Sequence, residues 1–508
     1  MKNKIIKIFN IIFALTFIYV IYNAIFQNTE NTWQYNPLLV IICTIIYIGI
    51  FILIYKWLTN KKKINGKIII LLFLFVICLQ LVIGYLFKVN PAWDVEDLFN
   101  VANEIIKKDK VNSSDFLIKR ETEKINLDYF YKYKNNLGME IILLGIFKIA
   151  DILKCVNQYD LSMLTNIILI DLSILFTYLC AKKMYGENKA FIVFLFLIMM
   201  TPIYLYVPII YTDTYSMLFP VLAYYLYLLA EERTEKKYVY YIIMSIIITI
   251  GMIIKPTVGI IAVSIIIINL LYENFKNIIS LTGILISIIS ITTILFNNFV
   301  PNIVFKDWND EEYNRKKLPL SNWIMMGLQE TGTYSVVDHY NITNIEGYEG
   351  KKQYAHDRIN KRFRYIQITG INKFLVKKLN TTWGEGTYFA QVMLKINSIN
   401  KGEHHEFIIQ NGNKTIIYKY FSQAQHMTMI ILILLSAFNV KNKNQNVLKL
   451  AIFGVLIFFA IWEARSRYLV NYLPIMTLLG VQGIENLFLM KDKILKYEIR
   501  NILTKNVT

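Results

Sequence analysis

Long apolar runs recur along most of this chain, and short polar connections rich in lysine separate them. Runs of about 20 apolar residues are long enough to cross the hydrocarbon core of a membrane as helices. The pattern predicts twelve spans, at residues 6–27, 37–58, 67–88, 161–181, 190–209, 213–230, 238–254, 256–272, 279–299, 427–440, 447–463 and 468–489. The run at 137–153 is shorter and carries Lys148 and Asp151, so we expect a helix that does not cross. The predicted fold class is an all-α polytopic membrane protein.

Composition supports this class. Hydrophobic residues make up 55% of the 508, and the mean hydropathy is +0.42. The first apolar run has a basic flank but no small-residue cleavage site, so we expect it to be an uncleaved span and not a signal peptide.

The lysines predict the orientation, because cytoplasmic loops of membrane proteins are rich in Lys and Arg. With twelve spans, these basic groups all fall inside: Lys2, Lys4, Lys7, Lys56, Lys61, Lys62, Lys63, Lys67, Lys182, Lys183, Lys189, Arg233, Lys236, Lys237, Lys441, Lys443, Lys449 and the tail from Lys491. The protein is therefore expected in the cell membrane, with two large polar segments outside.

This topology divides the chain into four parts. They are an N-terminal transmembrane hairpin (1–66), a transmembrane core (67–299) containing a first external loop (89–135), a small extracytoplasmic domain (300–426), and C-terminal transmembrane helices with a cytoplasmic tail (427–508).

The net charge of +18 resides mostly in the short loops, so it predicts membrane topology and not nucleic-acid binding. The four cysteines lie in or beside apolar segments, and the five histidines show no metal-ligand spacing. No phosphate-binding loop, dinucleotide fingerprint or nucleophile elbow is visible, so we expect neither metal nor cofactor.

Three cations do not fit the inside pattern, because they lie at short external joints between spans. They are Lys255 in "IIKPT", and Arg465 and Arg467 in "WEARSRYLVNYLP". Such cations either extend to lipid phosphates or form an anion site at the outer surface. We favour the second, with Glu463 pairing with Arg467 one helical turn on and Arg465 left free for a phosphate.

The first external loop opens with "WDVED", and the apolar spacing after it predicts an amphipathic helix on the membrane surface. Asp94 begins that helix, with Glu96 and Asp97 close behind. Asp94 is either a helix cap or a carboxylate placed to take a proton from a hydroxyl group.

Two further acids lie on the same predicted side. Asp213, in "YTDT", is either the cap of the next helix or a second acid of the same site. Glu385, in "TWGEGTYF", lies between Trp383 and Tyr388, an arrangement that suits either a sugar ring or an interfacial anchor.

An enzyme of this shape works outside the cell, where nucleotide donors are absent. Its activated substrate must arrive in the membrane, and a polyprenyl-phosphate-linked group is the obvious candidate. External cations would bind its phosphate, and an external carboxylate would deprotonate the acceptor.

The ordered set "WDVED", "YKNNLG", "AKKMYG", "YTDT" and "IIKPT", followed by a late external loop, resembles the GT-C membrane glycosyltransferases. The resemblance is to bacterial relatives of the protein O-mannosyltransferases and of the lipid A aminoarabinose transferase, and it runs from about residue 67 onward. "TWGEGTYF" and "WEARSRYLVNYLP" resemble a Gram-positive branch of that group.

The resemblance implies an inverting sugar transfer from a polyprenyl-phosphate-linked donor to a cell-envelope glycan, lipid or protein. It implies that Asp94 is the catalytic carboxylate and Asp213 the second acid, and that Lys255, Arg465 and Arg467 bind the phosphate. The mannosyltransferases pair Asp and Glu directly, whereas here Val95 follows Asp94. Which of Asp94, Glu96 and Asp97 is the base therefore stays open.

Other classes of function compete with this hypothesis. A transporter or flippase of lipid-linked sugars would need charges deep within the spans and internal repeats, which the sequence does not show. A polymerase or ligase using a longer lipid-linked glycan is chemically close. A non-catalytic envelope-assembly protein fits if Asp94 only caps a helix.

Overall fold

The structure is a computed structural model that describes residues 2–27, 34–60, 64–114, 126–154, 157–439 and 442–505. The lysines at 61–63 and Lys441, used above for orientation, lie outside the described residues, as does part of the first external loop. Within these ranges the chain is helical, with no strand and one isolated bridge between Val89 and Ser398. The predicted all-α class is confirmed.

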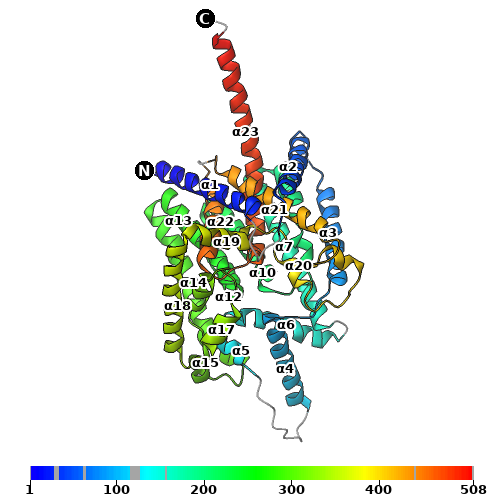
Figure 1. Ribbon diagram of the computed structural model, residues 1–508, viewed down its shortest axis with the longest axis vertical. Coiled ribbons are helices and arrows are strands. Elements are labelled where there is room, and N and C mark those ends of the chain that lie inside the picture. The colour runs from blue at the N-terminus through cyan, green and yellow to red at the C-terminus, as the bar shows by residue number, and fades with distance from the viewer. Residues whose placement is uncertain are drawn as a thin grey trace.

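Several helices match the predicted spans closely (Figure 1). Those long and apolar enough to cross a membrane, among the described residues, are α1 (Lys2–Phe26), α2 (Pro37–Thr59), α3 (Gly66–Leu86), α7 (Gln158–Tyr185), α12 (Lys237–Ile254), α14 (Phe275–Val304), α22 (Lys443–Ile461) and the first part of η5–α23 (Ser466–Leu489). The remaining predicted spans correspond to α8 (Glu187–Ile198), α11 (Leu218–Glu232), η3–α13 (Pro256–Tyr272) and α21 (Ile416–Ser436). The number of twelve spans therefore stays a prediction.

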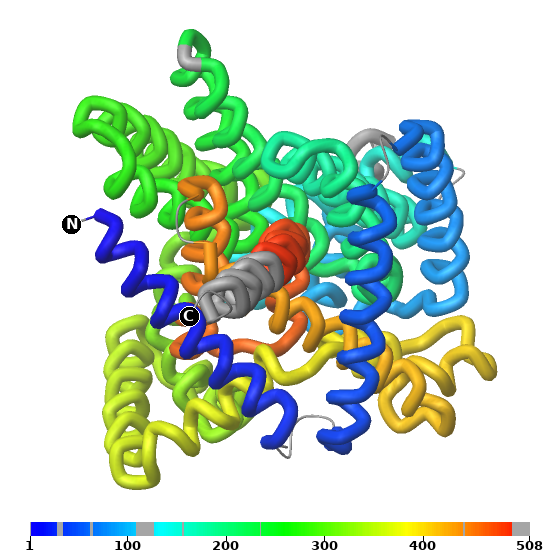
Figure 2. Tube along the Cα trace, turned by 90° about the horizontal axis from the view of Figure 1, so that it is seen from above, coloured from blue at the N-terminus to red at the C-terminus, as the bar shows by residue number. Residues whose placement is uncertain are grey.

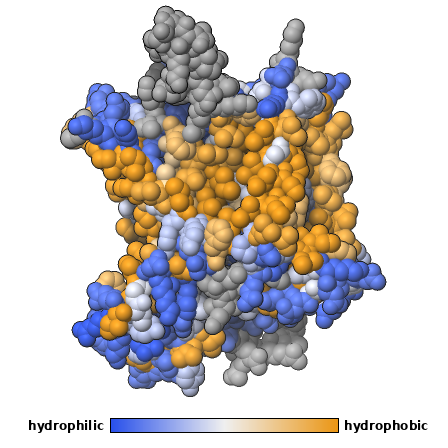
Figure 3. Space-filling model, turned by 45° about the horizontal axis from the view of Figure 1, so that its top comes forward, coloured by the Kyte–Doolittle hydropathy of each residue, from blue (hydrophilic) through white to orange (hydrophobic). Residues whose placement is uncertain are grey.

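The outer helices present apolar faces to their surroundings. Only 17% of the apolar window of α3 and 11% of that of α14 is buried inside the protein. Figure 3 shows a broad hydrophobic band around this face, bounded above and below by hydrophilic residues. A band of this kind, unpaired with protein, is suited to contact with lipid tails.

The centre of the bundle is formed by C-terminal helices packed on helices from the middle of the chain. Helix α23 (Leu473–Lys505) packs against α21, α8 and α7, and α11 packs on α7 and α12. Figure 2 shows α23 near the middle of the bundle, with α1 and α2 to either side of it. Figure 1 places both chain ends in the upper part of the molecule and α4 at the lower end.

The first external loop contains the predicted helix, α4 (Asp94–Ser114). Its apolar stripe does not lie on a membrane surface, which corrects the expectation from its amphipathic pattern. Leu98, Phe99 and Ala102 are buried, α4 packs against α6 (Leu137–Leu153), and Phe99 meets Phe147 edge to face.

Residues 300–426 form a second helical segment that packs closely on the bundle. Its elements include α15 (Asp310–Lys316), α16 (Ser321–Gly327), α17 (Val336–Thr343), α18 (Tyr348–Thr369), α19 (Ile371–Trp383), α20 (Ala390–Met393) and η4 (Glu403–Phe407). Helix α19 contacts α1, α22 and η5. Helix α21 already begins at Ile416, before the predicted end of this segment.

Candidate active site

The chain between α8 and α11 is irregular and carries "YTDT" into the protein. Pro202 and Pro208 lack the backbone N–H that a helix needs, and only the short helices α9 (Pro202–Leu205) and α10 (Thr212–Tyr215) form here. Irregular backbone at this depth must find partners within the protein. The amide nitrogen of Asn166 supplies them, donating to the carbonyls of Tyr206 at 2.8 Å and Val207 at 3.0 Å.

Asp213, in α10, is fully buried and lies between two cations. Its Oδ1 accepts from Lys255 Nζ, and its Oδ2 accepts from Arg467 Nη1 at 3.0 Å. Lys255 follows the last residue of α12, and Arg467 lies in η5 (Ser466–Tyr472). Three predicted site residues from distant parts of the sequence therefore form one buried ion-pair network.

Tyr211 connects this network to the first external loop. Its hydroxyl donates to Asp94 Oδ2 and accepts from Arg467 Nη2 at 3.3 Å. The guanidinium of Arg467 also stacks on the Tyr211 ring at 4.1 Å, which fixes its plane. We call Asp94, Tyr211, Asp213, Lys255 and Arg467 the joint cluster.

Residues 462–465, which include Arg465, are extended, and hydrogen bonds to the backbone of residues 321–333 hold them. Helix α22 ends at Ile461, and the N–H groups of Glu463 and Ala464 donate to the carbonyls of Trp323 and Gly332, both at 3.0 Å. Lys378 Nζ, buried in α19, donates to the carbonyls of Gly332 at 2.7 Å and Trp462 at 2.5 Å.

This conformation overturns the predicted pairing of Glu463 with Arg467. That pairing needs a continuous helical turn, and residues 462–465 are not helical. The Glu463 carboxylate instead accepts from the Tyr468 hydroxyl at 3.0 and 3.3 Å, while Arg467 binds Asp213. Burial raises the pKa of Glu463, and the charge of Arg467 opposes that shift.

Arg465 differs from Arg467, although it is only two residues away. Within the described part of the chain, no carboxylate lies at ion-pair distance from its guanidinium, which stacks on the Phe389 ring at 4.6 Å. Chain geometry keeps the Cα atoms of the two arginines within about 7 Å of each other. Arg465 is thus a half-buried cation beside the joint cluster with no ion-pair partner there.

Glu385 lies near Arg465, in the loop after α19. It is buried, and its carboxylate accepts from Ser466 Oγ at 2.5 Å and Gln391 Nε2 at 3.0 Å. Burial raises the pKa of Glu385, against the lowering effect of these hydrogen bonds. The aromatic residues around it, Trp383 and Tyr388, are fully buried, so a sugar ring has no access to their faces. Glu385 holds η5 in place.

Glu96 and Asp97 are not part of the joint cluster. Both are exposed on α4, and no hydrogen bond of the described residues joins either of them to Tyr211 or Arg467. Of the three candidate acids Asp94, Glu96 and Asp97, only Asp94 is connected to the cations.

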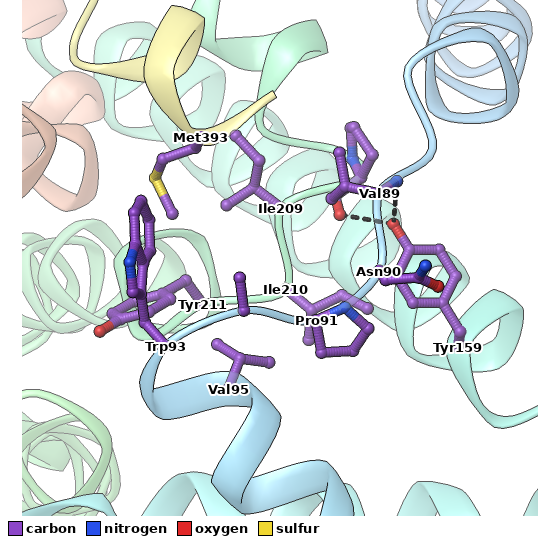
Figure 4. A pocket seen from close by; sticks show the side chains of 12 residues that line it. Val89, Asn90, Pro91, Trp93, Val95, Tyr159, Ile209, Ile210, Tyr211 and Met393 are labelled. Carbon is purple, nitrogen blue, oxygen red and sulfur yellow. Dashed lines mark hydrogen bonds between the residues drawn. The ribbon is translucent and has the colours of Figure 1, made fainter. Parts of the chain in front are cut away.

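A small apolar pocket opens beside Asp94. Its lining includes Val89, Trp93, Ile209, Tyr211 and Met393. Figure 4 shows Trp93 and Tyr211 together on one wall and Tyr159 opposite. Trp93, which directly precedes Asp94, lines this pocket and is 46% exposed.

Sequence reasoning missed the residues that connect the predicted ones. Tyr211 adjoins the "TDT" motif, and Tyr468 follows Arg467, so aromatic neighbours of the motif charges were the available signal. Lys378 gave none, because it reads as an ordinary lysine of an amphipathic helix. Within the described residues, no group of three or more His, Cys, Asp or Glu side chains is arranged to hold a metal ion.

Two solved structures resemble the fold. One is the archaeal oligosaccharyltransferase AglB from Archaeoglobus fulgidus in complex with an inhibitory peptide and a dolichol-phosphate, at 13% identity over 85% of this chain and 52% of that one, with a TM-score of 0.42. The other is an oligosaccharyltransferase from the same organism in the apo form, at 14% identity over 81% and 52%, with a TM-score of 0.38. This chain therefore spans about half the length of the structures it matches.

No curated protein matches the chain. A family model does match, over residues 1–487, and it is described as a conserved hypothetical integral membrane protein. The match covers nearly all of the sequence, including every residue of the joint cluster. The chain belongs to this family of integral membrane proteins.

Proposed function

We propose that this protein is a membrane glycosyltransferase that moves a sugar from a polyprenyl-phosphate-linked donor to a hydroxyl group of a cell-envelope acceptor. The reaction takes place on the extracytoplasmic face, at the end of the bundle opposite the lysine-rich loops. The observation that supports this is the joint cluster, which brings the half-buried Asp94 carboxylate next to the cations of Arg467 and Lys255. Arg465, which has no ion-pair partner among the described residues, lies beside them.

Asp94 is the base of the proposed reaction. Its Oδ2 accepts from Tyr211, and the side chain is half-buried at the start of α4, beside the open pocket. Asp213 cannot take this role, because both of its oxygens are bound to cations and it has no exposed surface. Its part is to hold Lys255 and Arg467 in position.

Arg465 is the main phosphate ligand. A guanidinium offers a fork of donors that fits phosphate oxygens, and no carboxylate of the described residues lies at ion-pair distance from this one. Arg467 and Lys255 add positive potential at the site, because the single negative charge of Asp213 offsets only one of their two positive charges. The partly exposed Trp93, directly before Asp94, offers an apolar surface for a sugar ring.

The reaction is a direct displacement with inversion. The acceptor oxygen bonds to the anomeric carbon as its proton passes to Asp94, and the bond from that carbon to the phosphate oxygen breaks. The electron pair leaves with the phosphate, where Arg465 stabilises the added charge.

The test uses the full chain reconstituted into vesicles with polyprenyl-phosphate-linked sugars and hydroxyl acceptors. Release of polyprenyl phosphate is measured for wild type, Asp94→Asn and Arg465→Ala. We expect both substitutions to reduce release strongly. Full release by both variants would exclude the proposed site.

A further inference from the structure

A basic groove lies between α18, α19 and the segment after α16, away from the joint cluster. Its lining includes the basic residues Arg358, Lys361, Arg362, Lys373 and Lys377, together with Gln329 and Glu330. We call it the basic groove. None of these residues contacts Asp94 or Arg465, so it is a separate site.

The charges of the groove are only partly compensated. Lys377 pairs with Glu330, Arg362 pairs with the buried Asp338 at 2.8 Å, and Arg358 also reaches Asp338 at 3.7 Å. For Lys361 and Lys373, the described residues provide no acid at ion-pair distance, and the Nε of Arg358 is buried without a hydrogen-bond partner. Unpaired donors and excess positive charge in one concave site favour an anion with several oxygen acceptors.

The start of α19, which lines one wall of the groove, contacts a helix of the apolar bundle. At the start of α19, Asn372 Oδ1 accepts from the Tyr19 hydroxyl of α1 at 2.5 Å, seven residues before α1 ends at Phe26.

Exposed apolar residues lie at the turn next to the groove. Ile368 is 84% exposed and Ile371 65%, on either side of the turn at Gly370 that joins α18 to α19, and Tyr365 lines the groove itself. Cations next to an exposed apolar turn match the two parts of a lipid, an anionic headgroup and its tails.

We propose that the basic groove binds the phosphate headgroup of an anionic lipid of the outer leaflet, whose tails lie against Ile368 and Ile371. Lys361, Lys373 and Arg358 contact the phosphate oxygens. The site is independent of the proposed sugar transfer, because it shares no residue with the joint cluster.

The wall of the basic groove nevertheless adjoins the backbone next to Arg465. Gln329 and Glu330 in its wall are followed by Gly332, whose carbonyl accepts from Lys378 and from the N–H of Ala464, next to Arg465. Gly332 has a φ of 67°, and an added Cβ would lie 2.3 Å from Lys378 Cδ, so this contact requires glycine. A bound lipid would thus lie against the segment whose backbone binds the residue next to Arg465.

The test measures binding of dioctanoyl phosphatidylglycerol to the full chain in nonionic detergent by native mass spectrometry. Dioctanoyl phosphatidylcholine supplies the same tails without net charge, and glycerol phosphate supplies the headgroup charge without tails. We expect phosphatidylglycerol to bind the wild type at least tenfold more tightly than either control. The double variant Lys361→Ala/Lys373→Ala should lose at least tenfold in affinity, and the matched Lys352→Ala/Lys395→Ala, which removes two exposed lysines elsewhere, should not.

Arg465→Ala separates the two sites. Unchanged phosphatidylglycerol affinity in this variant supports the groove, whereas its loss would place the lipid at the joint and overturn the proposal. Equal binding of phosphatidylcholine or glycerol phosphate, or unchanged affinity in the groove variant, would also overturn it. Failure of Asp94→Asn to affect sugar transfer would contradict the proposed function and leave the groove proposal standing.

Discussion

Asp94 and Asp213 lie on the same hydrogen-bonded network but in opposite environments. Asp94 is half-buried beside an open pocket, and a neutral phenol is its hydrogen-bond donor there. Asp213 is inaccessible to solvent, and each of its carboxylate oxygens accepts a hydrogen bond from a cation. The difference assigns separate work to two acids that look alike in the sequence, with proton transfer for Asp94 and the positioning of charge for Asp213.

The largest effect on stability is expected from Asp213→Asn. Removing this charge leaves Lys255 and Arg467 beside each other without the carboxylate that binds both, and breaking a buried ion pair costs about 3–5 kcal/mol. The free energy of unfolding of the purified protein measures the loss. Exposed Glu311 provides the matched control, since Glu311→Gln should change stability by less than about 0.5 kcal/mol.

A second substitution sharpens this prediction. Adding Lys255→Met to Asp213→Asn removes one of the uncompensated cations and should restore part of the lost stability. If the double variant were as unstable as the sum of its two single variants, Asp213 and Lys255 would not be coupled as the structure indicates.

Arg465→Ala should have the next largest effect, on the donor and not on the fold. A hydrogen bond to a charged group contributes about 1.5–3 kcal/mol, so kcat/KM for the donor should fall by roughly 10- to 150-fold. Arg465→Lys keeps the charge but loses the planar fork of donors, so its kcat/KM should lie between those of the wild type and Arg465→Ala. A variant with normal kcat/KM would show that the phosphate is bound elsewhere.

Tyr211→Phe should have the smallest effect of the three. It removes one hydroxyl that donates to Asp94 and accepts from Arg467, and a typical hydrogen bond contributes about 0.5–1.5 kcal/mol. Sugar transfer should fall by up to about tenfold. Tyr225→Phe is the control, because no hydrogen bond of the Tyr225 hydroxyl is seen among the described residues.

The sequence predicted the helices and the convergence of Asp94, Asp213, Lys255 and Arg467, because long apolar runs and out-of-place charges are local signals. It did not predict which charges pair. The Glu463–Arg467 prediction assumed a continuous helix. Instead, hydrogen bonds from the N–H groups of this segment to the carbonyls of Trp323 and Gly332, over 130 residues earlier in the chain, hold it extended.

Shortened helices were also beyond the sequence pattern. The region of the predicted spans at 190–209 and 213–230 reads as nearly continuous apolar sequence, yet the chain leaves the helix after Ile198. That break is tolerated because Asn166, on α7, satisfies the freed carbonyls. Such compensation comes from tertiary contacts, which periodicity does not record.

The central claim is that Asp94 takes the proton of the acceptor. Single-turnover release of polyprenyl phosphate from a bound donor, compared between wild type, Asp94→Asn and Glu96→Gln, tests it most directly, because both substitutions remove one carboxylate charge from the same turn of α4. General base catalysis contributes about 10²- to 10⁴-fold, so Asp94→Asn should slow release by that factor while Glu96→Gln stays close to wild type. Equal rates for Asp94→Asn and wild type, or a loss confined to Glu96→Gln, would contradict the account.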